Sequence, residues 1–285
     1  MIAIVVPTNR PERIKEFRKN WDLLFKKHNA EVIIVHDGEK PAVETTTGAY
    51  SLGKIMGDEA DLIYNFNDGV RNLGFAYVSR FLPDADTIVS LDDDVTPLGD
   101  TIADHLKVLG RFAPVTWLRI ASAYTRGFPY GVRGEAEIVL SHGVWEGVAD
   151  FDAPTQLVVG TPKISYYQGV IPKGVLYPHC AMNFAFKRKL LPYIYQAPMF
   201  GEINRFADIW GGIECKKDMD SLGWAVVTGY ATVRHDRASN VFTNLIKEAK
   251  GLKMNEEYGK DEYFKLFEEK RERWKKWTKK VSGMN

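Results

Sequence analysis

Apolar runs and amphipathic stretches alternate along the first part of the chain. Residues 2–6 and 31–35 are short runs rich in Ile and Val, and each predicts a strand that is buried on both faces. Between them, residues 12–27 carry large apolar side chains at helical spacing, among them Phe17 and Trp21. This strand–helix–strand order predicts a parallel sheet with a right-handed crossover.

The rest of the chain continues this mixture of strands and helices. Residues 116–160 are rich in glycine and have little helical periodicity, so we expect strands and loops laid over a site there. The other expected elements are a weaker strand at 62–65, a helix at 69–81, a strand at 87–91, a short helix at 187–195, a strand at 225–233 and lysine- and glutamate-rich helix from 240 to the end. The pattern predicts an α/β fold in which a mixed, mostly parallel sheet is flanked by helices.

Composition fits one large folded unit. Of the 285 residues, 45% are hydrophobic, which is enough to bury a sizeable core, and neither a repeat nor a low-complexity linker divides the sequence. We therefore expect one α/β domain over residues 1–251, with residues 252–285 as a charged helical extension of the same domain.

The net charge of +1 gives no reason to expect nucleic acid or an anionic membrane as a partner. The two cysteines, Cys180 and Cys215, lie far apart in the sequence, so neither a disulfide framework nor a thiolate zinc site is expected. We therefore expect a reducing compartment. Residues 1–7 are apolar but short and without a basic leader. We expect a first strand there, no membrane insertion and a cytoplasmic protein.

Three consecutive aspartates, Asp92, Asp93 and Asp94, directly follow the expected strand at 87–91. Like charges in a row repel one another, so the arrangement requires a cation or a set of donors to offset it. Open parallel sheets bind ligands at the carboxyl ends of their strands, and carboxylates suit a hard ion such as Mg²⁺ or Mn²⁺. The alternative is an acidic, solvated turn, but such turns seldom follow a β-branched apolar strand directly.

Polar residues that suit a nucleotide follow the first two expected strands. Pro7, Thr8 and Arg10 end the first, and the planar guanidinium of Arg10 suits a phosphate or a base. Asp37 and Gly38 end the second, and Asp37 is placed to accept hydrogen bonds from a base or a ribose. The competing role for Asp37 is to cap a helix or a turn.

Three acids and a histidine further along the chain are candidates for catalysis or metal binding. Asp150 and Asp152 share a face if they lie in a strand and then suit acid, base or substrate-binding roles, although an exposed pair is the simpler alternative. Asp208 lies among Phe, Ile, Trp and two glycines, where a raised pKa would suit a general base. His235 follows the expected strand at 225–233 and is a candidate metal ligand, against the commoner structural role of a single histidine.

Further basic and amide side chains are candidates for binding phosphate or sugar. Arg71 stands near an expected helix start, although a lone arginine is more often a surface residue. Arg126 and Arg133 belong to a glycine-rich stretch that would bring backbone close to a bound phosphate. Lys173 and Asn183 lie in apolar surroundings and suit sugar hydroxyls, and for Asn183 a buried, satisfied amide is an equal alternative.

A series of short segments runs in one order from residue 4 to about residue 251. The segments are Val6-Pro7-Thr8, His36-Asp37-Gly38, Leu91-Asp92-Asp93-Asp94, Arg126-Gly127-Phe128-Pro129, Ser141-His142-Gly143-Val144-Trp145, Asp150-Phe151-Asp152-Ala153-Pro154-Thr155-Gln156-Leu157, Ile171-Pro172-Lys173-Gly174, Met182-Asn183-Phe184-Ala185-Phe186, Asp208-Ile209-Trp210-Gly211-Gly212 and His235-Asp236-Arg237-Ala238-Ser239-Asn240. Together they resemble the reversibly glycosylated polypeptide family, whose members include UDP-arabinopyranose mutases and self-glycosylating proteins.

The resemblance implies a GT-A-like, Rossmann-type nucleotide-sugar fold in which the aspartates at 92–94 and His235 hold Mn²⁺ or Mg²⁺ against a UDP diphosphate. It places Asp37 near the uridine and matches Arg126 to the family's glycosylated arginine, with Arg133 as the second arginine of that motif. The family often has two adjacent acids where this chain has Ala207 before its aspartate, which leaves a role for both acids in doubt. The residues expected to bind the nucleotide sugar are Pro7, Thr8, Arg10, Asp37, Gly38, Arg71, Asp92, Asp93, Lys173 and Asn183.

The activity implied by the resemblance is metal-dependent interconversion of UDP-L-arabinopyranose and UDP-L-arabinofuranose, with a glycosyl-arginine at Arg126 as one route. A guanidinium is a poor nucleophile, so this route requires a carboxylate to accept its proton, and Asp208, Asp150 and Asp152 are the candidates. A self-glycosylating or protein-directed glycosyltransferase and a non-catalytic nucleotide-sugar binding partner remain as alternatives, and a homo- or hetero-oligomer is left open.

Overall fold

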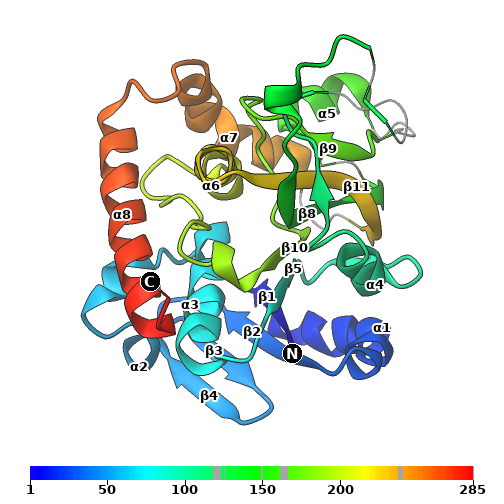
Figure 1. Ribbon diagram of the computed structural model, residues 1–285. Coiled ribbons are helices and arrows are strands. Elements are labelled where there is room, and N and C mark those ends of the chain that lie inside the picture. The colour runs from blue at the N-terminus through cyan, green and yellow to red at the C-terminus, as the bar shows by residue number, and fades with distance from the viewer. Residues whose placement is uncertain (118–122, 125, 149, 161–165, 237–239, 285) are drawn as a thin grey trace.

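The structure is a computed structural model that describes residues 1–117, 123–124, 126–148, 150–160, 166–236 and 240–284 (Figure 1). In this part of the chain, one eleven-stranded sheet runs through the molecule. The strands are β1 (Ile2–Thr8), β2 (Ala30–His36), β3 (Ala42–Thr45), β4 (Gly48–Ser51), β5 (Thr87–Leu91), β6 (Val95–Pro97), β7 (Phe112–Ala113), β8 (Ala136–Gly147), β9 (Gly169–Ile171), β10 (Asn183–Lys187) and β11 (Trp224–His235).

The strand order is β4-β3-β2-β1-β5-β10-β8-β11-β6, with β7 paired to β8 and β9 paired to β11. The two longest pairings, β1 with β2 and β8 with β11, are parallel, as is β1 with β5. Strand β10 runs antiparallel to both β5 and β8 and joins the two parallel parts into one mixed sheet. The predicted mixed α/β sheet flanked by helices is confirmed.

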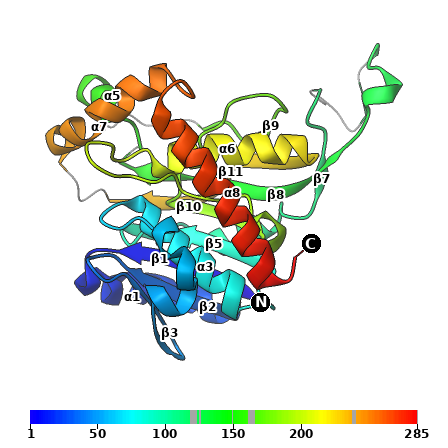
Figure 2. The same cartoon turned by 90° about the vertical axis from the view of Figure 1, so that its left-hand side faces the viewer.

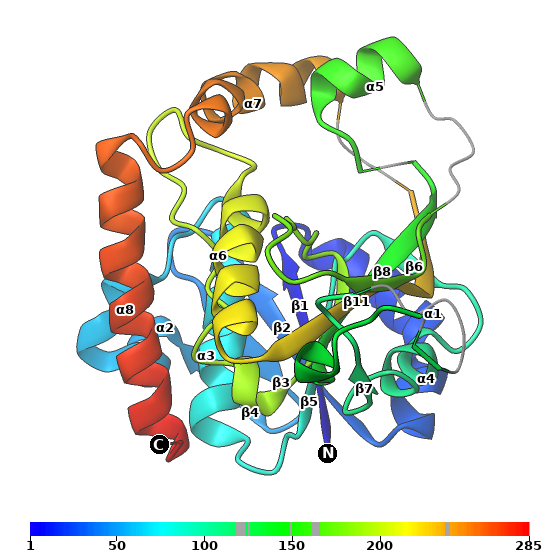
Figure 3. The same ribbon diagram turned by 45° about the horizontal axis from the view of Figure 1, so that its top comes forward.

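Helices cover both faces of the sheet (Figures 1 and 3). The helices are α1 (Ile14–Lys27), α2 (Leu52–Met56), α3 (Arg71–Phe81), α4 (Thr101–Leu106), α5 (Ala153–Val159), α6 (Ala207–Ser221), α7 (Val241–Glu256) and α8 (Glu262–Ser282). Helices α3, α6 and α8 pack into one hydrophobic cluster on one face, and α1 and α4 contribute to a second cluster on the other. Among the described helices, none is both long enough and apolar enough to cross a membrane.

The expected strands at 2–6, 31–35, 87–91 and 225–233 are all confirmed, as β1, β2, β5 and β11. They were readable because helices cover both faces of the central strands, so that β5, for example, is buried at every position. The expected helix at 12–27 is confirmed as a short 3₁₀ turn followed by α1.

The helix expected at 69–81 is confirmed as α3, preceded by a 3₁₀ turn. The helical tail expected from residue 240 is confirmed as two helices, with Asp261 capping α8 through the Tyr263 N–H at 2.9 Å. Helix α8 buries Phe267 and Trp274 in the cluster that also contains α3 and α6. Residue 251 falls inside α7, and the expected division there stays a prediction.

Other expectations are wrong. Residues 62–65 form no strand, because a 3₁₀ helix ends at Leu62 and irregular chain follows. Only one 3₁₀ turn, Arg188–Leu190, lies in the helix expected at 187–195. The stretch at 116–160 contains a twelve-residue strand, β8, and a helix, α5, rather than short strands and loops alone.

Helix α3 lies close against the first two strands because Gly74 has no side chain. A Cβ at this position would lie 2.4 Å from Val5 Cγ1 in β1 and 2.8 Å from Val35 Cγ2 in β2. The close approach lets Arg71, one turn earlier in α3, reach Ser90 in β5. The packing of α3 thus decides where that arginine stands.

Gly74→Ala should lower the free energy of unfolding by about 1–3 kcal/mol through overpacking, although alanine alone favours a helix by about 1 kcal/mol. Urea denaturation would measure the change. Gly53→Ala in α2 is the matched control, because a Cβ there meets nothing within 4 Å, and this variant should be as stable as the wild type or more so. Equal destabilisation in both variants would contradict the close approach of α3.

Candidate functional site

A cavity of about 840 Å³ opens at the carboxyl ends of β1, β2 and β5. Segments that are far apart in the sequence complete its wall, namely the turn before α3, residues 150–152, the loop before α6 and one face of α7. In Figure 3, α5 and α7 lie side by side, apart from the helices that cover the sheet. The cavity therefore combines the strand ends of the sheet with a cover of two helices.

The aspartate triplet, Asp92, Asp93 and Asp94, lies in this cavity against two arginines. Arg71, only 2% exposed, forms an ion pair with Asp92, and Arg10 forms ion pairs with Asp93 and, at 3.2 Å, with Asp94. Two guanidinium groups thus face three carboxylates. The triplet keeps an excess of negative charge that a bound cation would offset.

Two further contacts orient this group of charges. The Thr8 hydroxyl, at the end of β1, donates to Asp93 Oδ2 at 2.6 Å. The Arg71 guanidinium also donates to the Ser90 hydroxyl in β5. These bonds hold the carboxylates and guanidinium groups in defined positions. The structure brings Thr8, Arg10, Arg71 and the triplet to one cavity, and their expected role in binding a nucleotide sugar stays a prediction.

Asp94 faces His235 at the end of β11. His235 Nδ1 donates to the Val148 carbonyl at 2.9 Å, so the neutral ring presents the lone pair of Nε2, which lies 3.9 Å from Asp94 Oδ1. Burial, and then the charge of Asp92, raises the pKa of Asp94. Two metal ligands can lie up to about 4 Å apart, because each is about 2 Å from the ion, so this pair fits a divalent cation.

In the residues that the structure describes, no three His, Cys, Asp or Glu side chains form a ready-made metal site. Mg²⁺ is commonly held by one or two carboxylates together with substrate phosphates, and two protein ligands suit that mode of binding. The residues present therefore fit an ion that is bound together with a diphosphate.

Asp37 lines the cavity beside the end of β1. Its backbone N–H donates to the Thr8 carbonyl at 2.8 Å, and its Oδ1 accepts from the Gly38 N–H at 2.8 Å and the Phe66 N–H at 2.7 Å. Burial raises the pKa of Asp37, whereas these backbone bonds lower it. Asp37 thus has the turn-capping role weighed in the sequence, and it also lines the cavity.

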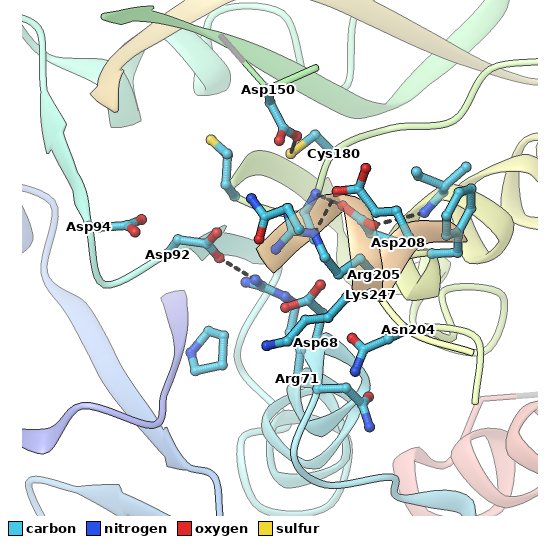
Figure 4. Close-up of a pocket in the computed structure, with 18 of the residues that line it drawn as sticks. Asp68, Arg71, Asp92, Asp94, Asp150, Cys180, Asn204, Arg205, Asp208 and Lys247 are labelled. Carbon is cyan, nitrogen blue, oxygen red and sulfur yellow. Dashed lines mark hydrogen bonds and ion pairs between the residues drawn. The ribbon is translucent and has the colours of Figure 1, made fainter. Parts of the chain in front are cut away.

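Three acids, Asp68, Asp150 and Asp208, form a second acid group in the wall of the cavity (Figure 4). Asp208, at the start of α6, accepts from the Ala181 N–H at 3.1 Å. Burial, followed by the charges of Asp68 and Asp150, raises the pKa of Asp208 to about 7. A carboxyl group in this range is present in both protonation states near neutral pH.

The neighbours of Asp208 share its environment. The Cys180 thiol donates to Asp150 Oδ2 at 2.9 Å, and burial raises the pKa of this thiol well above its usual value. The pKa of Asp68, which is exposed to the solvent in the cavity, is also raised, by desolvation from the surrounding protein and then by Asp92, although Arg205 and Arg71 lower it. The carboxylates of the second acid group therefore repel one another when they are ionised. Protonation, or hydrogen bonds from a bound hydroxyl-rich ligand, would reduce this repulsion.

Arg205 stands next to these acids in an unusual backbone conformation, with φ of +64°. Its Nε donates to Glu248 Oε1 at 2.8 Å, and Glu248 Oε2 accepts from the Ala153 N–H at 2.7 Å. Glu248, only 4% exposed, thus ties the loop before α6 to α7 and to the first residue of α5. Lys247, from the same face of α7, also lines the cavity (Figure 4).

The structure does not bring Arg126 and Arg133 to this cavity. Arg126 is exposed, and Arg133 donates to the Phe128 carbonyl at 2.9 Å and lies over the Tyr130 ring at 3.7 Å. Both lie between β7 and β8, where residues 126–135 project from the body of the molecule (Figure 2). Their expected roles stay predictions.

Other predicted residues also lie outside the cavity wall. Lys173 is exposed, with its backbone N–H bonded to the Val115 carbonyl at 2.8 Å. Asn183 is fully buried in β10 and donates to the Val144 carbonyl at 3.1 Å, which matches the alternative of a satisfied amide. Gly38 adjoins Asp37 without lining the cavity.

Asp152 lines the cavity but caps α5 through the Thr155 N–H at 2.9 Å. Arg237, Ala238 and Ser239, of the segment that begins at His235, lie outside the described residues.

Sequence reasoning did not single out Phe66, Asp68, Arg205, Lys247 or Glu248, all of which line the cavity. Asp68 had a local signal, since it stands in the turn just before Arg71. No local pattern marks the other four, because distant segments bring them together.

Comparison with known proteins gives a family match. The family profile described as "Reversibly glycosylated polypeptide" matches residues 1–269. The chain is 32% identical over 280 residues to "Probable UDP-arabinopyranose mutase 4" of Arabidopsis thaliana, covering 90% of this chain and 75% of that protein. It is 30% identical over 275 residues to "UDP-arabinopyranose mutase 1" of Oryza sativa subsp. japonica, covering 88% and 74%.

A solved structure titled as the catalytic domain of Drosophila β1,4-galactosyltransferase 7 in complex with xylobiose is 13% identical, with a TM-score of 0.39. The likeness covers 85% of this chain and 72% of that chain. At this level it bears on neither substrate nor mechanism.

The raised pKa of Asp208 predicts a pH-dependent stability. Between about pH 4 and pH 7 the unfolded chain loses the Asp208 proton while the folded protein keeps it, so this residue lowers the free energy of unfolding progressively as pH rises. Asp208→Asn should therefore gain stability relative to the wild type over this range, by up to about 1.4 kcal/mol for each pH unit.

Urea denaturation at pH 5, 6 and 7 would follow this difference, with Asp58→Asn as the control because Asp58 is an exposed acid outside the cavity. A stability difference between Asp208→Asn and the wild type that is the same at all three pH values would show that Asp208 is not shifted.

Proposed function

The chain belongs to the reversibly glycosylated polypeptide family, and we propose that it interconverts UDP-L-arabinopyranose and UDP-L-arabinofuranose. Relatives at 30–32% identity that carry the name UDP-arabinopyranose mutase support the reaction. The observation that carries the proposal is the presence of two acid groups in one cavity. One is flanked by arginines, which suit a diphosphate, and the other contains a carboxyl group with a pKa of about 7.

The diphosphate is proposed to lie at the aspartate triplet, near Arg10 and Arg71. Guanidinium groups bind phosphate through paired donors, and both arginines are already held in place by carboxylates. Asp94 and His235 would hold Mn²⁺ or Mg²⁺ beside it. When bound, such an ion stabilises negative charge on the diphosphate as its bond to the sugar breaks.

The sugar is proposed to lie at the second acid group. Conversion of a pyranose to a furanose breaks the anomeric bond to UDP, opens the ring, closes another hydroxyl onto C1 and returns the UDP, so that no atom leaves. Protons must move on and off the sugar hydroxyls in this sequence. Asp208 suits that role because its pKa near 7 lets it give and take a proton at neutral pH.

A covalent glycosyl-arginine at Arg126 stays a prediction. Arg126 is exposed and outside the cavity wall, so the projecting segment would have to bring it to the sugar. The self-glycosylating or protein-directed transferase remains the second candidate, because the same cavity would serve it. A binding partner without catalysis is disfavoured by the group with a pKa near 7, which binding alone does not require.

Incubation with UDP-arabinopyranose and Mn²⁺ should yield UDP-arabinofuranose, and Asp208→Asn should slow the conversion about 10²- to 10⁴-fold. Chromatography of the nucleotide sugars would measure the rates, with Asp58→Asn expected to match the wild type. Wild-type turnover in Asp208→Asn would remove Asp208 from the mechanism. Free UDP with a sugar adduct on the intact protein, and no furanose, would favour the transferase.

Asp94→Asn and His235→Ala should each weaken the binding of Mn²⁺ in the presence of UDP about tenfold or more, because each removes a proposed ligand. Electron paramagnetic resonance of free Mn²⁺ would measure the affinity. His28→Ala is the matched control, because His28 pairs with Asp100 at 2.8 Å outside the cavity. Unchanged affinity in both site variants would contradict the proposed metal position.

A further inference from the structure

Phe66 lines the cavity from a strained position. Its φ is +59°, a left-handed conformation that side chains other than glycine rarely adopt. Its side chain is 65% exposed and lines the cavity, so burial in a core does not account for the conformation. Strain of this kind persists only where the surroundings impose it, and it is concentrated at functional sites.

The surroundings of Phe66 do impose it. Asp37 Oδ1 accepts both the Phe66 N–H at 2.7 Å and the Gly38 N–H at 2.8 Å. The Asn65 side-chain amide donates to the Gly38 carbonyl at 2.8 Å, and the Asn67 amide donates to the Asn65 carbonyl at 2.6 Å. The Asn65 amide and the Asp37 carboxylate thus hold this segment to the end of β2, and the Asn67 amide makes a bond within the segment.

The position of Phe66 relative to the aspartate triplet suits a nucleoside diphosphate. Asp37 follows β2 and Asp92 follows β5, with β1 between these strands. Neighbouring strands are about 4.8 Å apart, so the two strand ends are separated by about 10 Å. A ligand with its diphosphate at the triplet and its ribose across the end of β1 would place its base beside Asp37 and Phe66.

We propose that Phe66 is the surface on which the base of the bound nucleotide stacks, and that Asp37 is the positioning residue that fixes the ring. The inference rests on the proposed function, because it takes the ligand to be a UDP-sugar. Stacking on an aromatic ring accepts any base, so Phe66 supplies affinity and does not select uracil. Asp37 then has two roles, because it holds Phe66 through the backbone N–H and can also contact the nucleotide.

A singly exposed aromatic residue is common and by itself requires no explanation. Phe66 differs because glycine would fit its backbone with less strain, and because three side chains are committed to holding the segment. A phenylalanine kept in that conformation at the wall of a cavity is accounted for by a ligand that contacts the ring.

Phe66→Gly removes the aromatic ring and the backbone strain together, so a structural role and a binding role of Phe66 predict different results for this variant. The melting temperature should stay the same or rise, whereas the dissociation constant for UDP in the presence of Mn²⁺ should increase about 5- to 150-fold, the range expected for one base stacked on an aromatic ring. Phe66→Tyr keeps an aromatic face and should bind UDP within about twofold of the wild type. Isothermal titration calorimetry would measure the dissociation constants of both variants, and thermal denaturation would measure the melting temperature.

Pyrophosphate with Mn²⁺ is the control ligand, because it lacks a base, and Phe66→Gly should not change its affinity. The proposal is overturned if Phe66→Gly binds UDP as tightly as the wild type does. It is also overturned if the variant loses pyrophosphate affinity to the same extent or melts at a lower temperature, since Phe66 would then be structural. A wild-type protein that binds pyrophosphate but not UDP would refute the proposed function itself.

Discussion

The opposition of three carboxylates by two arginines at the end of β5 is the constraint on which the rest of the site depends. Arg71 reaches the triplet from α3, and Arg10 reaches it from the loop after β1. The pairing of β1 with β5 and the close packing of α3 at Gly74 hold both arginines in place. The charge that these arginines leave unpaired is what makes the strand ends suitable for a cation and a diphosphate together.

The second acid group depends on a different part of the fold. Asp208 starts α6, Asp68 precedes α3, and Asp150 precedes α5, so three separate packing contacts bring like charges together. Burial, and then the charges of Asp68 and Asp150, raise the pKa of Asp208 to about 7. The ion pair between Arg205 and Glu248 connects this group to the two covering helices. A cavity with one end suited to phosphate and the other to proton transfer follows from these contacts.

Local sequence patterns predicted the strand ends well and the cover of the site poorly. The strands β1, β2 and β5 are continuous apolar runs because both faces are covered, and the aspartate triplet directly follows one of them. Helix α6 escaped notice because Gly211 and Gly212 weaken its pattern. Both positions require glycine. A Cβ at Gly211 would lie 2.6 Å from the Tyr195 carbonyl oxygen, and a Cβ at Gly212 would lie 2.6 Å from the His179 backbone nitrogen.

The contacts of Arg205, Glu248 and Phe66 with the site arise only in three dimensions. Arg205 and Glu248 are 43 positions apart, and Phe66 is 29 positions from the aspartate that holds it, so no motif spacing connects them. Arg126 shows the reverse case, because its motif is legible in the sequence while its side chain stands outside the cavity. A sequence motif identifies the family of a protein more reliably than it predicts where a side chain lies in the structure.

A crystal structure of the protein with UDP and Mn²⁺ would test the central claim most directly. The account predicts the diphosphate beside Arg10 and Arg71, an anomalous signal from the ion between Asp94 and His235, and the base over Phe66. The second acid group would remain open for the sugar. UDP bound away from the ends of β1, β2 and β5, or an ion held elsewhere with those carboxylates unchanged, would contradict it.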